Sequence, residues 1–304
     1  MTELLTDVVG GVGQLTLNRP RAINALTLEM MRAATTTLEL WAGDQAVNAV
    51  EIRGAGDRGL CSGADVRAMA AQVTAGDQWL AFLAAEYSLD QVIAHYPKPV
   101  TAYMRGVCMG GGIGISAHAS RRIVDETTVC AMPETKIGWC PDVGTMGLLA
   151  RGGAVGRHVA LTSATFAGGD AIRLGFADEP ANGPLNAALS ESAWITECYA
   201  PDDAIEIAHR LETSPSPEAR VAARELRARS PLGVLVAMRL LLRSADLSLS
   251  EVFEQDLRVA QRLLPLGDFA EGVRALLIDK DNTPEWRYAR LEDVPPSLID
   301  DLVG

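Results

Sequence analysis

Three consecutive glycines, Gly110, Gly111 and Gly112, constrain this chain more than any other feature of its sequence. The apolar, strand-like stretch Val100–Met104 is predicted to lead into them, and because they lack side chains the backbone can turn there without steric clash. If a helix begins at this turn, its first amide N–H groups have no partner within the helix and can stabilise a developing oxyanion. For a lone run of three glycines, close packing of a helix on a sheet is the favoured explanation, and the surrounding sequence changes that preference.

A second glycine-rich turn stands about fifty residues earlier in the chain. The β-rich segment from Asn48 to Arg53 leads into Gly54 and Gly56, and then into the run Cys61–Val66, which contains Gly63. Two turns of this kind can supply two convergent amide groups to one anion.

Two carboxylates follow the triple-glycine turn. Glu134 lies in Met132-Pro133-Glu134-Thr135, and Asp142 lies eight residues later in Pro141-Asp142-Val143-Gly144. A carboxylate next to an oxyanion site can act as a general base on water or attack a carbonyl directly. The alternatives are that Glu134 is an exposed acid beside a proline, and that Asp142 is the N-cap of a helix from Val143 to Arg151.

Together these residues resemble the crotonase superfamily, also called the enoyl-CoA hydratase/isomerase superfamily, whose members stabilise the enolate or tetrahedral oxyanion of an acyl-CoA thioester. The resemblance rests on Cys61–Val66 and Gly106–Gly112, with Asn18-Arg19-Pro20 and Asn24-Ala25-Leu26 as further matches. It implies an α/β fold with a ββα spiral core, and an oxyanion hole formed by the N–H groups of Ala64 and Gly111. It also implies that neighbouring residues line the substrate site, namely Gly63, Asp65, Gly110 and Gly112.

Within the superfamily, the chain is most similar to the 3-hydroxyisobutyryl-CoA hydrolases. The similarity runs from about Leu15 to Val294 and so covers nearly the whole chain. It rests on Glu86-Tyr87, Met109–Ser116, Ala131–Thr135, Ile137-Gly138, Pro141–Gly144, Glu271–Ala275, Asp279-Lys280-Asp281, Pro284 and Trp286. The chain departs from this subgroup at Thr145 and Met146, where further glycines are usual, and at Arg105, where histidine or asparagine is usual.

Gly114 separates hydrolase from hydratase chemistry. Hydratases that resemble this chain carry a glutamate two residues after the third glycine, and pair it with the glutamate of the later Pro-Glu to add water across a double bond. Glycine cannot transfer a proton, so this chain lacks that arrangement. The second carboxylate stands instead at Asp142, where many hydratases have glycine.

The resemblance therefore implies hydrolysis of a CoA thioester, with 3-hydroxyisobutyryl-CoA in valine catabolism as the expected substrate. Glu134 is the expected base or nucleophile, and Asp142 would orient water or the substrate hydroxyl, or share the proton transfer. Two acids in one cleft repel each other, which raises the pKa of one of them and suits it to act as a base near neutral pH. Two alternatives stay open: an enoyl-CoA hydratase/isomerase with Glu134 as its main acid/base, and a noncatalytic acyl-CoA-binding protein.

Composition limits the class of protein and its location. The 304 residues are enough to bury about three quarters of the unfolded surface in one or two domains. Although 48% of the residues are hydrophobic, charges interrupt each stretch before the roughly 20 apolar residues of a membrane helix. The start of the chain, Met1 to Asp7, lacks the basic and apolar regions of a secretory signal, so we expect a cytoplasmic protein without a membrane partner.

Cysteine and charge content narrow the cofactors and partners. The five cysteines are an odd number at irregular spacing, which fits a reducing compartment and small buried side chains rather than disulfides or a zinc site. A net charge of −12 argues against a nucleic-acid surface. The expected partner is an acyl-CoA thioester, with CoA as part of the substrate, and no metal or separate cofactor is expected. Trimers and hexamers are common in the superfamily, so a homo-oligomer stays an open alternative.

Alternating strands and helices predict an α/β core over residues 1–200, and residues 201–304 are predicted to form a C-terminal helical region. The β-like segments are Val8–Leu17, Asn48–Arg53, Val100–Met104, Arg122–Asp125 and Thr128–Ala131. Helices are predicted at Thr27–Trp41, with Thr27 as N-cap, and at Gln78–His95, Asp202–Glu212, Pro217–Arg229, Pro231–Ser244, Leu249–Leu263 and Asp268–Ile278. Gly168–Pro184 is predicted to be a connection.

Overall fold

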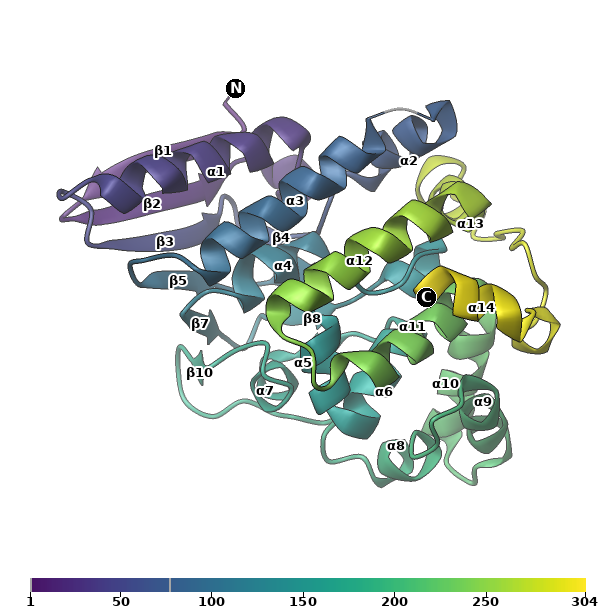
Figure 1. Ribbon diagram of the computed structural model, residues 1–304. Helices are drawn as coiled ribbons and strands as arrows, with labels where there is room; N and C mark the ends of the chain where they lie inside the picture. The colour runs from purple at the N-terminus through teal and green to yellow at the C-terminus, as the bar shows by residue number, and fades with distance from the viewer. Residues whose placement is uncertain (1, 77) are drawn as a thin grey trace. The chain divides into compact units, whose positions relative to one another are not determined.

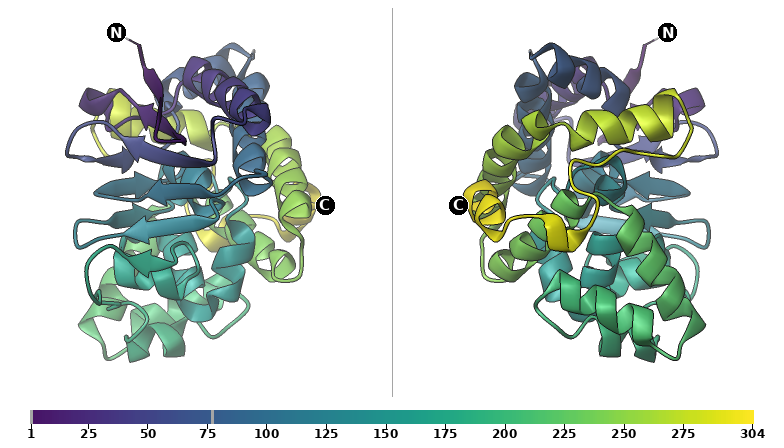
Figure 2. Two further views of the ribbon diagram at one scale, coloured as in Figure 1. Left: turned by 90° about the vertical axis from the view of Figure 1, so that its left-hand side faces the viewer. Right: turned by 90° about the vertical axis from the view of Figure 1, so that its right-hand side faces the viewer.

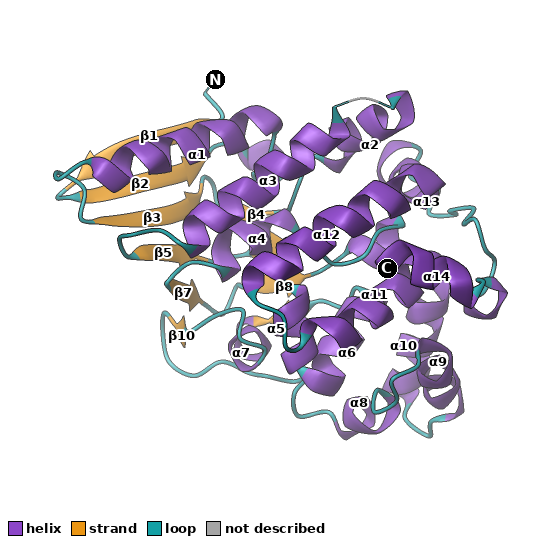
Figure 3. Cartoon of the chain, viewed as in Figure 1, coloured by secondary structure: helices purple, strands orange, loops and turns teal. Residues whose placement is uncertain are grey.

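The chain divides into two compact units, one containing the strands and one built of helices. The computed structural model describes residues 2–76 and 78–304. The first unit comprises Met1–Asp65, Ala81–Ala131 and Phe166–Ala187, and the second comprises Val66–Leu80, Met132–Thr165 and Ala188–Gly304. Figure 3 shows the strands, all of which belong to the first unit, in orange and the helices of both units in purple.

Two sheets form the framework of the first unit (Figure 1 and Figure 2). The larger has the order β1 (Leu4–Val9), β2 (Val12–Leu17), β3 (Ala49–Gly54), β5 (Val100–Tyr103), β7 (Arg121–Val124) and β10 (Glu179–Pro180). The smaller has the order β4 (Gly59–Cys61), β6 (Val107–Met109), β8 (Val129–Ala131) and β9 (Phe166–Ala167). The β1–β2 and β8–β9 pairs are antiparallel, and the other neighbouring strands are parallel.

The strand order reveals a repeating path. From β3 to β8, consecutive strands alternate between the larger and the smaller sheet, and helices connect one pair of strands to the next. Parallel neighbours require such crossover connections. This arrangement is the ββα spiral that the resemblance implies, and the predicted α/β fold class is confirmed.

The core of the first unit lies between the larger sheet and its helices. The helical segments of this unit are η1 (Pro20–Ala22), α1 (Leu28–Gly43), α3 (Trp79–Ala94, which begins in the second unit), α4 (Gly111–Ala117) and α7 (Gly168–Arg173). Met30, Ala34 and Leu38 lie four residues apart on one face of α1, and all three are buried. Helices therefore cover the larger sheet of the first unit, and an apolar core lies between them.

Helix α11 lies at the centre of the second unit, where it packs on α5, α6 and α14. The early helices of this unit are α2 (Val66–Ala75), η2 (Glu134–Ile137), α5 (Met146–Arg151) and α6 (Gly153–Thr162). The later ones are α8 (Ala193–Cys198), α9 (Ala204–Thr213), α10 (Pro217–Ala228), α11 (Pro231–Ser244), α12 (Leu249–Leu263), η3 (Leu264–Leu266), α13 (Asp268–Val273), η4 (Arg274–Ile278), η5 (Leu291–Asp293) and α14 (Pro296–Val303). Within residues 2–76 and 78–304, no helix combines the length and the apolar character needed to cross a lipid bilayer.

Most predicted elements are confirmed within a few residues. The Thr27 hydroxyl caps α1 by accepting a hydrogen bond from the Met30 amide. The five predicted C-terminal helices correspond to α9–α13, with the last turn of the fifth forming the π-helix η4.

Three predictions of secondary structure are wrong. The β-like segment Val8–Leu17 is part of a hairpin, because Gly10 and Gly11 adopt positive φ and turn the chain between β1 and β2. The segment Gly168–Pro184 contains α7 and β10, so it is more than a connection. The strand from Val100 does not lead directly into the triple glycine, since β6 lies between them.

The predicted division at residue 200 falls within the second unit's last segment, Ala188–Gly304. The contacts group these residues with Val66–Leu80 and Met132–Thr165, which precede position 200. A compact unit is not in itself an independently folding domain, so the division into residues 1–200 and 201–304 stays a prediction.

Candidate active site

The two glycine-rich turns meet in the first unit. A Cβ placed on Gly111 would lie 3.3 Å from the amide nitrogen of Ala64, and one placed on Gly63 would lie 3.4 Å from that of Gly111. Gly111 is the first residue of α4, so its N–H cannot be satisfied within the helix. Among the described residues, no backbone carbonyl accepts a hydrogen bond from the Ala64 or Gly111 amide. The structure thus brings together the two amides that the sequence pairs.

Glycine is required at these turns for two physical reasons. Gly63 and Gly110 have φ of +104° and +50°, values that residues with a side chain rarely adopt. A Cβ on Gly112 would collide with the carbonyl oxygen of Cys61, where the turns pass each other. The glycines therefore permit close approach of the turns as well as the sharp change in direction.

Asp65, predicted to line the substrate site, pairs with an arginine in the first unit. Arg19 places Nη2 3.1 Å from Asp65 Oδ2, and its Nη1 donates to the Ala25 carbonyl. The Asp65 amide donates to the carbonyl of Leu26. These contacts tie the Ala64 turn to the segment that resembles the family's first strand and turn, and the binding role of Asp65 stays a prediction.

Helix α3 carries two buried acids, and one of them lies against Gly111. Glu86 is 2% exposed, and a Cβ on Gly111 would collide with its Oε1. Asp90 follows one helical turn later and is fully buried. The pKa of the nearby Cys61 thiol is raised, mainly by burial and further by Cys108, Glu86 and Asp90. Sequence analysis used Glu86 only as a motif residue, although acids four residues apart in an apolar helix signal a buried polar site.

Glu134 is buried in the second unit, so the interpretation of it as an exposed acid is wrong. Glu134 is only 6% exposed, and it is the first residue of η2. The next residue, Thr135, is held by a hydrogen bond between its hydroxyl and that of Ser163 (2.7 Å) and by the Ser230 amide, which donates to its carbonyl. The backbone that follows Glu134 is thereby fixed.

Asp142 lies in a strained turn and is not the N-cap of a helix. Helix α5 begins at Met146 with Thr145 at the N-cap position, three residues later than predicted. Asp142 is 7% exposed, and its carbonyl accepts hydrogen bonds from the amide and the hydroxyl of Thr145. Val143 follows with φ of +51°, a conformation that costs about 1–3 kcal/mol in a β-branched residue. Such strain persists only where the surroundings impose it.

Three acids of the second unit act on the thiol of Cys140 through their charge. The pKa of this thiol is raised, first by burial and then by the charges of Asp142, Asp256 and Glu134. The pKa of Asp256 is itself well above its ordinary value, because the carboxyl is buried and lies near Asp142. Glu134 and Asp142 are thus brought together around one thiol, and sequence analysis missed Asp256, which comes from α12. All five cysteines are buried free thiols, as predicted.

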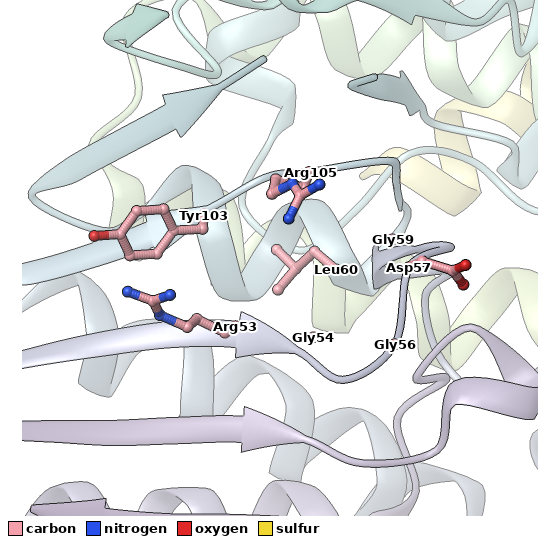
Figure 4. A pocket seen from close by; sticks show the side chains of 8 residues that line it. All are labelled: Arg53, Gly54, Gly56, Asp57, Gly59, Leu60, Tyr103 and Arg105. Carbon is pink, nitrogen blue, oxygen red and sulfur yellow. The ribbon is translucent and has the colours of Figure 1, made fainter. Parts of the chain in front are cut away.

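A separate cavity of about 110 Å³ opens at the ends of β3 and β5 in the first unit (Figure 4). Arg53 lies over the ring of Tyr103, 4.1 Å from its centroid, and pairs with Glu51. Arg105, a departure from the hydrolase subgroup, pairs with Asp125. Both guanidinium groups of the lining are therefore neutralised by neighbouring carboxylates.

The fold and the glycine-rich turns define a class of acyl-CoA enzymes, and comparison with known proteins identifies the family. Residues 12–191 and 179–303 match the family described as enoyl-CoA hydratase/isomerase. The chain belongs to the enoyl-CoA hydratase/isomerase family, and the family predicted from the sequence is confirmed.

The curated relatives include hydrolases that are similar to this chain over almost their full length. One is the mitochondrial 3-hydroxyisobutyryl-CoA hydrolase of Danio rerio, 35% identical over 98% of this chain and 88% of that protein. The human protein of the same name is 32% identical over 96% of this chain and 86% of its own length. The similarity to the hydrolase subgroup predicted from the sequence is confirmed.

Solved structures with similar folds carry other titles. A carnitinyl-CoA dehydratase from Mycobacterium thermoresistibile is 39% identical, has a TM-score of 0.96, and aligns over 100% of this chain and 97% of that one. An enoyl-CoA hydratase from Rhodobacter sphaeroides is 35% identical, with a TM-score of 0.93 and coverage of 99% and 97%. Proteins similar to this chain are therefore described as hydrolases, dehydratases and hydratases, so the reaction follows from the residues and not from the fold.

Proposed function

We propose that this protein is a CoA-thioester hydrolase that converts 3-hydroxyisobutyryl-CoA to 3-hydroxyisobutyrate and CoA in valine catabolism. The observation that carries the proposal is the placement of the carboxyls. Gly114 occupies the position of the first hydratase glutamate, whereas Glu134 and Asp142 are both buried beside Cys140. The curated relatives named as hydrolases of this thioester support the choice of substrate.

In the proposed reaction, a water oxygen attacks the thioester carbonyl carbon while Glu134 accepts the proton of that water. The Ala64 and Gly111 amides donate to the oxyanion that forms. Collapse of the tetrahedral intermediate breaks the C–S bond, and the thiolate leaves as CoA after taking the proton from Glu134. Each oxyanion donor contributes about 2.7–4 kcal/mol, and the general base about 100- to 10,000-fold in rate.

Asp142 orients the attacking water or the substrate hydroxyl in this proposal, and the residues flanking the amides, Gly63, Asp65, Gly110 and Gly112, line the acyl group. Direct attack by Glu134 is the alternative covalent route. Single-turnover hydrolysis in ¹⁸O-labelled water tests the covalent route. If water opens the mixed anhydride at the Glu134 carboxyl carbon, the product keeps an unlabelled oxygen from Glu134, and general-base hydrolysis never gives such a product.

The proposal extends to cofactors, location and assembly. CoA arrives as part of the substrate, and the reaction uses only water besides it. A cytoplasmic location and a homo-oligomer complete the proposal. Cell fractionation tests the location, and light scattering of the purified protein tests the assembly. The relatives of this chain are named as mitochondrial proteins, so a mitochondrial fraction is the alternative outcome of the first experiment.

The deciding assay is release of free thiol from 3-hydroxyisobutyryl-CoA, with crotonyl-CoA as a parallel substrate. We expect rapid release from the hydroxy thioester and release about 100- to 10,000-fold slower from a Glu134→Gln variant. Hydration of crotonyl-CoA without thiol release would instead establish a hydratase, the activity named for one of the solved structures. Tight CoA binding without turnover of either substrate would favour a noncatalytic acyl-CoA-binding protein.

A further inference from the structure

Helix α12 directs three side chains at the turn that carries Asp142. A Cβ on Gly144 would lie 2.7 Å from Phe253 Cζ and 2.9 Å from Leu249 Cδ1. The Gly144 amide donates to Asp256 Oδ2 at 2.9 Å. Leu249, Phe253 and Asp256 occupy positions i, i+4 and i+7 and so share one face of the helix. One helix face therefore presents two apolar contacts and one hydrogen-bond acceptor to a single turn.

This turn needs an external constraint. Val143 and Gly144 have φ of +51° and +73°, and two successive residues in this region cannot belong to a helix or a strand. The hydrogen bond to Asp256 links residues 112 positions apart in the sequence. It fixes the backbone two residues after Asp142, on the far side of the strained valine.

We propose that Asp256 is a positioning residue of the reaction, which acts through the Gly144 amide to fix the Asp142 carboxyl. The inference rests on the proposed function, because it assigns Asp256 a role through Asp142. It adds to the predicted site a residue that does not touch the substrate.

Burial and the neighbouring charge of Asp142 favour the protonated form of the Asp256 carboxyl. It is 2% exposed, and its Oδ1 has no hydrogen-bond partner within the described parts of the chain. Burial and the Asp142 charge raise its pKa, and the hydrogen bond from Gly144 only partly opposes them. The charges of Asp142 and Asp256 also raise the pKa of the Cys140 thiol.

Other charged groups on the packed elements do not change this balance. Helix α5 carries Arg151, and α14 carries Asp300 and Asp301. Asp300 pairs with Arg239, and neither Arg151 nor Asp301 contributes to the pKa of Asp256. If Asp256 ionised, two carboxylates would repel each other within one buried turn, so we expect kcat to fall at alkaline pH as the pair loses its second proton.

The test compares Asp256→Leu with Asp256→Asn in the full-length enzyme. Leucine removes the acceptor, and a displacement of about 1 Å at a reacting group costs about 100-fold in rate, so kcat should fall about 100-fold with KM changed less than about threefold. Asparagine keeps an oxygen acceptor for Gly144 but cannot ionise. It should restore kcat to within about tenfold of wild type and abolish the alkaline fall. Glu254→Gln, an exposed acid on α12, is the matched control.

A double-mutant cycle with Asp142→Asn separates positioning from general stability. If Asp256 acts through Asp142, Asp256→Leu should lower kcat by less than about threefold in the Asp142→Asn background. Equal losses in both backgrounds, or an unchanged alkaline limb in Asp256→Asn, would overturn the inference. If the leucine variant does not fold, the asparagine pH profile alone decides.

A spectroscopic measurement makes the inference independent of the assay. At neutral pH, the infrared difference spectrum between wild type and Asp256→Asn should contain the carbonyl band of a protonated carboxyl, and its absence would contradict an uncharged Asp256. A wild-type enzyme that releases no thiol would contradict the proposed function, and this band would still test Asp256.

Discussion

The two units contribute different kinds of chemistry. In the first, the candidate oxyanion hole consists of backbone amides at Ala64 and Gly111, and glycines make the approach of the two turns possible. In the second, the candidate groups are the buried carboxyls of Glu134 and Asp142, which helices hold in place. Backbone amides do not titrate, whereas carboxyls do. The first site therefore depends on steric fit, and the second on burial and charge.

The largest effect should come from removing the base in the second unit. Glu134→Gln preserves the shape of the side chain but cannot accept a proton, so we expect kcat to fall about 100- to 10,000-fold with little change in KM. Steady-state thiol release measures both constants. Asp246→Asn, an exposed acid of the same unit, should match wild type, and an equal loss in this control would refute the assignment.

The corresponding test of the first unit is steric. In Gly111→Ala, the new Cβ collides with Glu86 and comes within 3.3 Å of the Ala64 nitrogen. Displacing one oxyanion donor should lower kcat about 100- to 1,000-fold. Gly43→Ala adds a Cβ with nothing within 4 Å and serves as the control.

Buried His158 should make the second unit sensitive to acid. Its Nδ1 lies 2.9 Å from the Tyr199 hydroxyl, and burial lowers the pKa of the imidazole to about 4. Below pH 6.5, the ordinary pKa of histidine, the unfolded chain binds a proton at His158 that the folded chain excludes. The free energy of unfolding therefore decreases as the pH is lowered, and the loss reaches about 3 kcal/mol near pH 4.

Urea unfolding from pH 7 to pH 4 measures this loss. His158→Gln should reduce the pH dependence, and the exposed His209→Gln should leave it unchanged. Hydrogen exchange should show opening of the second unit before the first. A pH dependence that persists in His158→Gln would assign acid sensitivity to other groups.

A smaller effect on stability should follow from overpacking the Asp142 turn. Gly144→Ala meets Phe253 and Leu249 within 3 Å and should lower the free energy of unfolding by about 1–3 kcal/mol beyond the backbone cost. At Gly153 the φ is similarly positive, +58°, but the space around a new Cβ is open. Gly153→Ala should therefore lower the free energy of unfolding only by the cost of the backbone conformation. Equal unfolding free energies for the two variants would show that the contacts with α12 contribute little.

The smallest effect should be that of a thiol reagent. All five cysteines are buried, and burial raises the pKa of Cys61 and of Cys140, so neither presents a reactive thiolate. Iodoacetamide should leave activity unchanged while the protein is folded, and should label all five thiols in urea. Rapid loss of activity in the folded state would reopen a role for a cysteine nucleophile.

Local patterns predicted the helices well. Thr27 precedes a run with apolar residues at helical spacing, and Ser230 and Ser248 are the N-caps of α11 and α12. The capping residue and the apolar spacing are both local features of the sequence. The same local logic failed at residues 168–173, where two glycines suggested a loop but lie inside α7. Gly168 and Gly169 are buried there, and a Cβ on Gly169 would collide with the Asn186 carbonyl, so packing outweighs helix propensity.

The sequence by itself determined the family, the ββα core, the paired glycine turns and the choice of Glu134 and Asp142, because glycine spacing and motif order are local properties of the chain. Only the tertiary structure decided that both acids are buried, that Val143 takes a strained conformation, and that Asp256 meets the Gly144 amide. Burial and charge depend on neighbours more than a hundred residues away. The environment that sets a pKa therefore cannot be read from the order of residues around the group that titrates.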